Sequence, residues 1–172
     1  MDLRHTKTLI TGKPGIGKTT LVRRIVELLP MDSMAGFYTA EIRSAGHRAG
    51  FELRGLNGER RILAHVDMKS RHRVGRYGVD TAGFEDFLDK SDLLNPNLAL
   101  VVIDEIGKME LFSELFRTLV LQLLESDKRL LATVALHGRG FIQAVKQRPD
   151  VYLIEVTRDN RDALTHIILH QG

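Results

Sequence analysis

The stretch "LITGKPGIGKTTLVRRI", residues 9–25, passes from an apolar strand pattern through glycines into a helix pattern. Thr8–Thr11 predicts a strand, and the apolar spacing across Lys18–Leu29 predicts a helix that Pro30 ends. Between them, Gly12–Thr19 fits the pattern G-x-x-x-x-G-K-[ST]. A strand, a glycine-rich loop and a helix in this order predict a loop that wraps around phosphate groups.

The residue types of this loop each suit the binding of phosphate groups. Glycines let successive backbone N–H groups point inward around an anion, and the start of the following helix adds partial positive charge. Lys18 can reach the β- and γ-phosphates, and the Thr19 hydroxyl can ligate Mg²⁺. We therefore expect the loop to bind a nucleoside triphosphate. The expected contacts come from Gly12, Lys13, Pro14, Gly15, Ile16, Gly17, Lys18, Thr19 and Thr20.

A second apolar strand, Leu98–Ile103, ends in two carboxylates, Asp104 and Glu105. A charge at the end of a buried strand is costly unless a cation or hydrogen bonds meet it. We expect Asp104 to share a Mg²⁺ ion with Thr19, and Glu105 to orient or deprotonate an attacking water. The alternative is that both acids only cap the following turn. A doubled acid beside a phosphate-binding loop favours hydrolysis over simple nucleotide binding.

The same acids open the tetrapeptide Asp104–Gly107, which fits D-x-x-G, the γ-phosphate sensor of switch GTPases. This pattern adds Gly107 to the expected nucleotide contacts, beside Asp104 and Glu105. No N-K-x-D guanine motif occurs anywhere in the chain, so strong guanine selectivity is not expected. Asn160 and Arg161 follow the last predicted strand, where they could contact the base or ribose. The alternative is that Asn160 or Asp159 caps the last helix.

The remaining periodicity predicts an α/β fold. Three short β-like runs, at 37–42, 50–54 and 61–66, are separated by turn sequences, and Asn57-Gly58 is a strong hairpin signal. Apolar strands then alternate with helices from residue 82 to the end, which is typical of a parallel sheet covered on both faces. We predict a single domain over 1–172: a three-layer α/β sandwich, mainly parallel, with an antiparallel β-meander insertion near residues 36–66.

Through these motifs the sequence resembles a known family, the small P-loop nucleoside triphosphatases of thermophiles. The animal relative of this family is called cancer-related nucleoside-triphosphatase. The resemblance covers essentially the whole chain, and DEIGKMELFS is its most specific part. It implies a RecA-like P-loop fold and slow, Mg²⁺-dependent hydrolysis of several nucleoside triphosphates. For such a reaction, the loop and the doubled acid described above make Lys18 and Glu105 the expected catalytic residues. The stretches that carry it are GKPGIGKTTL (12–21), GFYTAEIR (36–43), VGRYGVD (74–80), VVIDEIGKMELFS (101–113) and EVTRDNRDAL (155–164).

Positive charge is concentrated in one segment of the chain. The chain's net charge is +3, yet residues 43–76 hold nine Arg/Lys and three Asp/Glu. This basic segment is either a solvated hairpin surface or a flap over a polyphosphate or a nucleic acid, and the solvated surface is favoured. The arginines that could stabilise charge on a γ-phosphate are Arg71, Arg73, Arg76 and Arg139.

Composition excludes several other classes. The chain has no cysteine, so disulfides, thiolate zinc sites and cysteine nucleophiles are excluded. It has no apolar run long enough to span a membrane, and the residues from Met1 to His5 show no apolar h-region, so we expect no secretory signal and a cytoplasmic protein. Two alternatives to a triphosphatase stay open: a small nucleotide or nucleoside kinase, and a nucleic-acid-binding NTPase that uses the basic segment. The sequence carries no signal for the oligomeric state.

Overall fold

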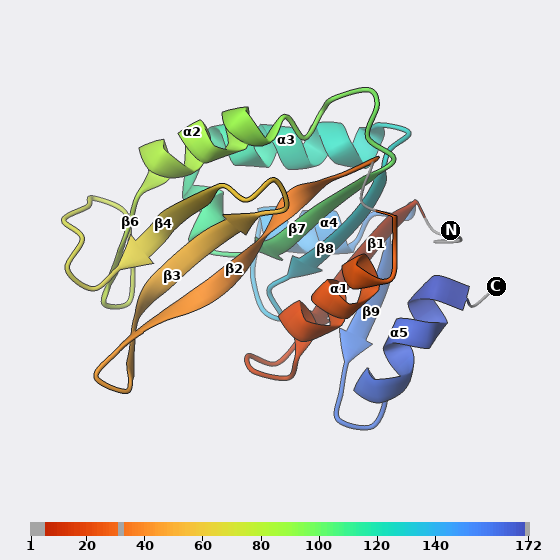
Figure 1. Ribbon diagram of the computed structural model, residues 1–172, viewed down its shortest axis with the longest axis horizontal. Helices are drawn as coiled ribbons and strands as arrows, with labels where there is room; N and C mark the ends of the chain where they lie inside the picture. Colours follow the sequence, from red (N-terminus) through yellow and green to blue (C-terminus); the bar gives the residue numbers. More distant parts are fainter. Residues whose placement is uncertain (1–5, 31–32, 171–172) are drawn as a thin grey trace.

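The computed structural model describes residues 6–30 and 33–170, apart from the side chain of His170. In this part of the chain, nine strands form one sheet in the order β5-β6-β4-β3-β2-β7-β8-β1-β9 (Figure 1). The strands are β1 (Lys7–Gly12), β2 (Met34–Ser44), β3 (His47–Gly55), β4 (Arg60–His65), β5 (Arg73–Val74), β6 (Tyr77–Val79), β7 (Leu100–Ile106), β8 (Arg129–Val134) and β9 (Tyr152–Val156).

Helices cover both faces of the parallel half of the sheet, where β2, β7, β8, β1 and β9 run in the same direction. The helices are α1 (Lys18–Glu27), α2 (Thr81–Ser91), α3 (Glu114–Glu125), α4 (Phe141–Lys146) and α5 (Arg161–His170), with a short 3₁₀ turn η2 (Glu110–Phe112). Helices α1 and α5 pack on one face, and α2, α3 and α4 pack on the other (Figure 1). This is the predicted three-layer α/β sandwich.

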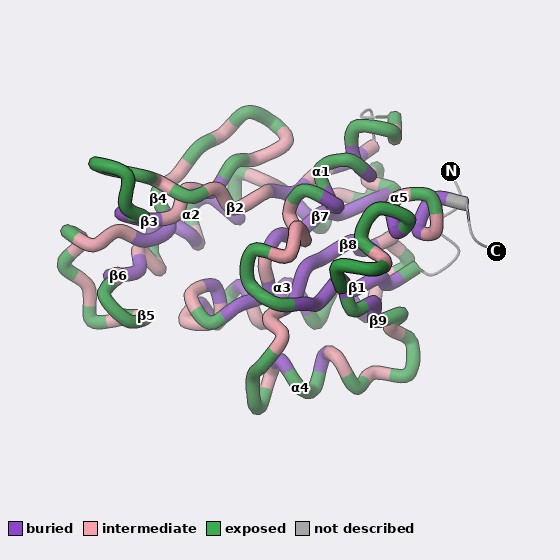
Figure 2. Tube along the Cα trace, turned by 90° about the horizontal axis from the view of Figure 1, so that it is seen from below, coloured by how far each residue is buried: buried purple, intermediate pink, exposed green. Residues whose placement is uncertain are grey.

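The two apolar cores explain why the helices take these positions. On the α2–α3 side, the ring of Phe37 packs edge-on against Phe84 and Phe87, with ring centres 6.0 and 5.6 Å apart. On the α1 side, Val22 and Ile25 pack against the other face of the central strands. Figure 2 shows these central strands as the buried part of the molecule, whereas the outlying loops are exposed. Each helix therefore buries one apolar stripe against the sheet.

The antiparallel half differs from the predicted meander in its extent. Strand β2 is no separate insertion, because its first residues, Met34–Phe37, pair in parallel with Leu100–Ile103 of β7. Beyond them β2 continues into the antiparallel series β2-β3-β4-β6-β5, which runs to Val79 rather than ending near residue 66. The added hairpin β5–β6 consists of two- and three-residue strands, which are too short to show the alternation that identifies a strand in sequence.

The parallel direction of β1, β7 and β8 brings their carboxyl ends to one edge of the sheet. The loop after β1, the two acids of β7 and the loop after β8 therefore converge there. Strand β8 lies between β1 and β7, so its side chains can contact both. None of the described helices has the length and apolar character needed to cross a bilayer.

Candidate active site

The loop after β1 adopts backbone angles that suit glycine and leave the start of α1 open. Gly17 precedes α1 with φ of 111°, a conformation that a side chain would strain, and no side chain caps the helix there. At Gly12, a Cβ atom would lie 2.8 Å from the carbonyl oxygen of Val156. The first N–H groups of α1 are thus left to face an incoming anion. The Lys18 ammonium donates to the Gly12 carbonyl at 3.1 Å, across the mouth of the loop.

Asp104 is the best-connected polar side chain of the site. It is 2% exposed, and its two carboxylate oxygens accept hydrogen bonds from Thr19 at 2.7 Å and from Thr133 at 2.5 Å. The hydroxyl of Thr39, on β2, donates to the Asp104 backbone carbonyl. The start of α1 and strand β8 therefore hold the Asp104 carboxyl group, and strand β2 holds its backbone.

Burial and hydrogen bonding act in opposite directions on the two acids of β7. Burial raises the pKa of the Asp104 carboxyl above its ordinary value, while the bonds from Thr133 and Thr19 oppose the rise. Burial also raises the pKa of Glu105, against the positive charge of Lys18. The peptide bond between the two residues is cis, and the pairing of β7 with β8 shifts register between Ile103 and Ile106.

These groups line one cleft of about 580 Å³ at the carboxyl edge of the sheet. Its lining contains most of the predicted loop contacts, together with Asp104 and Glu105. Lys13, Ile16 and Gly107 are not part of the lining. The lining residues are Gly12, Pro14, Gly15, Gly17, Lys18, Thr19, Thr20, Thr39, Glu41, Arg48, Phe51, Asp104, Glu105, Ala135, Leu136 and His137.

Gly107 lies outside the cleft lining, against a buried carboxyl group. A Cβ atom at Gly107 would lie 2.9 Å from Oε2 of Glu110. Burial raises the pKa of Glu110 to about 8, against hydrogen bonds from its own backbone N–H and that of Gly107. The backbone N–H of Gly107 thus interacts with the Glu110 carboxyl group, and Gly107 is outside the cleft lining.

The four predicted arginines all lie outside the cleft lining. Arg71 lines a separate cavity beside α2, and Arg139 is exposed in the loop after β8. Arg73 donates to the carbonyl of Arg76 at 2.7 Å, and Arg76 donates to the carbonyl of Arg48. The β5–β6 hairpin thus supports Arg48, which itself lines the cleft.

Asn160 and Arg161 also lie outside the lining. The Asn160 side chain accepts from the backbone N–H of Thr157 at 2.8 Å and donates to the carbonyl of Glu155 at 2.9 Å. Arg161 forms an exposed ion pair with Asp162 at 3.7 Å. Asn160 therefore shapes the turn between β9 and α5.

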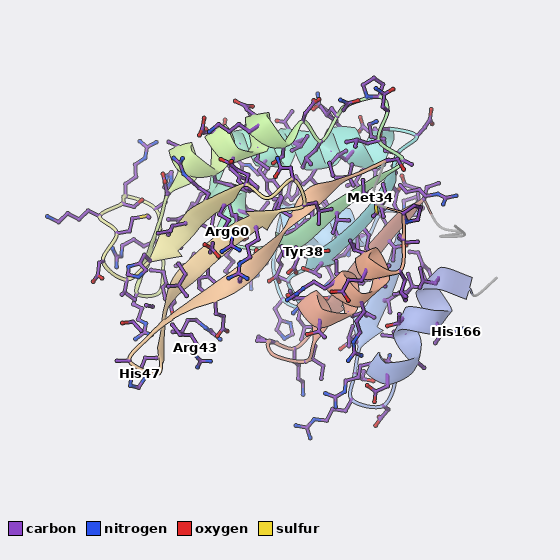
Figure 3. The ribbon with its side chains drawn as sticks, viewed as in Figure 1. Met34, Tyr38, Arg43, His47, Arg60 and His166 are labelled. Atoms are coloured by element: carbon purple, nitrogen blue, oxygen red, sulfur yellow. The ribbon has the colours of Figure 1, made fainter. Side chains whose placement is uncertain are left out.

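Sequence reasoning missed several residues of the cleft. Thr39 and Thr133 contact Asp104 from neighbouring strands, and Glu41, Arg48 and Phe51 form a wall on the β2–β3 hairpin. Figure 3 shows Arg43 and His47 toward the free end of that hairpin, beyond the cleft. The basic segment was one signal, because it contains Arg48, but it did not distinguish this arginine from its neighbours.

The oxygen donors at Thr19 and Asp104 fit Mg²⁺, a hard cation that prefers hydroxyl, carboxylate and phosphate oxygens. The Thr19 hydroxyl already lies 2.7 Å from an Asp104 oxygen. No group of three or more His, Cys, Asp or Glu within the described part of the chain could hold a metal ion. A Mg²⁺ ion at this position would therefore take its remaining ligands from phosphate and water.

Comparison with known proteins places the chain in a family. A family model described as NTPase matches residues 7–169, nearly the whole chain. The chain belongs to this NTPase family. It is 42% identical over 164 residues to a protein named nucleoside-triphosphatase THEP1 from Thermotoga sp. (strain RQ2), covering 95% of this chain and 93% of the relative. The predicted family resemblance is confirmed.

Two solved structures of NTPase family relatives have the same fold. The crystal structure of THEP1 from the hyperthermophile Aquifex aeolicus superposes with a TM-score of 0.82 at 35% identity, covering 96% of this chain and 99% of the other. The solution structure of a human cancer-related nucleoside triphosphatase gives 0.80 at 37% identity, covering 95% of each chain. These similarities confirm the predicted P-loop α/β fold.

Proposed function

We propose that this protein hydrolyses nucleoside 5′-triphosphates to nucleoside diphosphate and phosphate, with Mg²⁺, broad base specificity and slow turnover. The observation that carries the proposal is that one cleft combines the phosphate-binding loop, the Thr19–Asp104 pair and Glu105. Relatives named nucleoside-triphosphatases support the same activity over a kinase or a nucleic-acid-binding NTPase.

In this proposal each group has a distinct task. The backbone N–H groups of the loop and the Lys18 ammonium bind the phosphates and orient the β–γ bond. Thr19 and Asp104 would hold Mg²⁺ together with phosphate oxygens, and the bound ion would neutralise charge on the β- and γ-phosphates. Glu105 accepts a proton from the attacking water. Thr133 and Thr39 keep Asp104 in place.

The function is tested by following γ-labelled triphosphate with the purified protein and Mg²⁺. We expect nucleoside diphosphate and labelled phosphate in equal amounts, at a rate that added nucleosides, nucleoside monophosphates or RNA do not raise. Transfer of the label to an added nucleoside or nucleotide would identify a kinase instead. Turnover only in the presence of RNA would identify a nucleic-acid-dependent NTPase.

Base selectivity is expected to be weak. The cleft lining consists mainly of phosphate-binding and acidic groups, and the Asn160 amide is occupied by backbone atoms. A missing base contact costs only about 1–3 kcal/mol, so kcat/KM for ATP, GTP, CTP and UTP should agree within about two orders of magnitude. Steady-state kinetics on the four substrates measure this directly. A wider preference for one base would contradict the proposed breadth.

Replacing Lys18 by alanine is expected to weaken both binding and turnover, because its charge meets the phosphates before and during bond cleavage. A hydrogen bond to a charged group contributes about 1.5–3 kcal/mol, so Kd should rise by roughly 10- to 100-fold, with kcat also reduced. Lys90→Ala is the control, since Lys90 is 53% exposed on α2, pairs with Asp86 at the surface and lies outside the cleft lining. Equal losses in both variants, measured by nucleotide titration and phosphate release, would count against the role of Lys18.

A further inference from the structure

The wall of the cleft on the β2–β3 hairpin carries a positive charge that belongs to none of the nucleotide-binding motifs. Arg48, near the start of β3, lines the cleft together with Glu41 and Phe51. Among the described lining residues, Lys18 and Arg48 are the two lysine or arginine side chains. They share the cleft with three carboxylates, from Glu41, Asp104 and Glu105, so these two cations are the side chains that can balance negative charge developing on a phosphate there.

Contacts to both the guanidinium group and the backbone carbonyl orient Arg48. Its guanidinium group pairs with the Glu41 carboxylate and lies 5.5 Å from the centre of the Phe51 ring. The Phe51 ring in turn meets the edge of Tyr77, with ring centres 5.2 Å apart. Arg76 donates to the Arg48 backbone carbonyl. The β5–β6 hairpin therefore holds both the backbone and the stacking partner of this arginine.

The position of the β2–β3 hairpin indicates which end of a bound triphosphate would lie near Arg48. Lys18 and the Thr19–Asp104 pair mark where the β- and γ-phosphates would lie. Strand β2 is the neighbour of β7 on the side away from β8 and β1, and Thr39 on β2 bonds to the carbonyl of Asp104. The hairpin thus extends from the acidic side of the site, which is the γ-phosphate side.

We propose that Arg48 is a catalytic residue whose guanidinium group contacts the γ-phosphate oxygens during hydrolysis; this inference rests on the proposed triphosphatase function. The water oxygen bonds to the γ-phosphorus as the bond from that phosphorus to the bridging oxygen breaks. The electron pair of that bond stays on the diphosphate, and the water proton goes to Glu105. Arg48 donates hydrogen bonds to the charge that spreads over the γ-phosphoryl oxygens and exchanges no proton. Glu41 holds Arg48 at the wall until phosphate oxygens compete for it.

Arg48→Ala tests this assignment against a matched control, Arg54→Ala. Both arginines belong to β3, each pairs with a glutamate, and both side chains are 47% exposed, but Arg54 is not part of the cleft lining. An arginine at the γ-phosphate is worth about 10³–10⁵ in kcat. We expect a loss of at least about 10²-fold for Arg48, because it is half-exposed and paired with Glu41. Nucleotide Kd should change only a few-fold, and Arg54→Ala should stay near the wild-type rate.

Free guanidinium ion supplies a second readout. Added at low concentration, it should restore part of the Arg48→Ala rate and leave the wild type and Arg54→Ala unchanged. A lost rate without rescue would assign Arg48 to holding the hairpin and overturn the catalytic assignment. Near-wild-type turnover by Arg48→Ala, or an equal loss in Arg54→Ala, would overturn it as well.

The same series separates this inference from the function on which it rests. A wild-type protein that binds but does not hydrolyse the triphosphate overturns the proposed function, and the role of Arg48 with it. An active wild type with an equally active Arg48→Ala variant overturns only the Arg48 assignment. Thermal melting checks that each variant is folded, and Arg48→Lys replaces the alanine variant if that variant does not fold. Because lysine keeps the charge but loses the planar fork, a kcat clearly below wild type is expected and a wild-type kcat overturns the assignment.

Discussion

Replacing Glu105 by glutamine is expected to lower kcat by about 10²–10⁴, the usual contribution of a positioned general base, while nucleotide Kd changes only a few-fold. Glutamine keeps the size and one hydrogen-bonding oxygen of the side chain but cannot accept the proton of the attacking water. In the proposed site the loop backbone and Lys18 hold the triphosphate, so its affinity should survive. Single-turnover phosphate release and nucleotide titration on the same sample separate the two effects.

Glu114→Gln is the control for this experiment. Glu114 begins α3, its side chain is 90% exposed, and it pairs with Arg117 at the surface, so removing its charge should leave both kcat and Kd unchanged. If Glu105→Gln hydrolyses triphosphate at nearly the wild-type rate, Glu105 only caps the turn after β7. The base would then have to be assigned to another residue of the cleft.

The sequence alone was sufficient to predict those parts of the site whose geometry follows from one short, continuous segment. The strand, loop and helix around Gly12–Thr19 are adjacent in the chain, so their arrangement follows from one short segment. The proximity of Thr19 and Asp104 was also predictable. A charge that ends a buried parallel strand must meet a partner at the same edge of the sheet, and the two side chains lie 2.7 Å apart.

Contacts that depend on strand order could not be read from the sequence. Thr133 reaches Asp104 because β8 lies between β1 and β7, and no local pattern encodes that order. Thr39 was outside the prediction for a similar reason. Strand β2 was expected to belong to an insertion, whereas it is the direct neighbour of β7 and therefore contacts the Asp104 carbonyl.

The sequence also could not show which arginine of the basic segment lines the cleft. Nine basic residues in the 43–76 segment have similar local sequence surroundings, and only a three-dimensional arrangement distinguishes Arg48 from Arg76. Arg76 turns its side chain to the Arg48 carbonyl, which places Arg48 at the cleft and Arg76 behind it. A flap over phosphate was one of the two interpretations of the basic charge, and of these nine residues Arg48 is the one that lines the cleft.

Removing divalent metal is expected to abolish hydrolysis and leave part of the nucleotide binding intact. In the proposed mechanism Thr19 and Asp104 act through Mg²⁺, since the Thr19 hydroxyl lies against Asp104 and a carboxylate repels phosphate oxygens unless a cation lies between them. The loop backbone and Lys18 bind the phosphates without metal, so affinity should fall but not vanish.

One measurement tests most directly whether the P-loop cleft is a hydrolytic site. Phosphate release from one triphosphate is compared in Mg²⁺ and in excess EDTA, and nucleotide binding is followed in parallel. The account predicts turnover in Mg²⁺, no turnover above background in EDTA, and restoration of the rate when Mg²⁺ is added back. Undiminished phosphate release in excess EDTA would contradict it, because the Thr19–Asp104 pair would then have no part in the reaction.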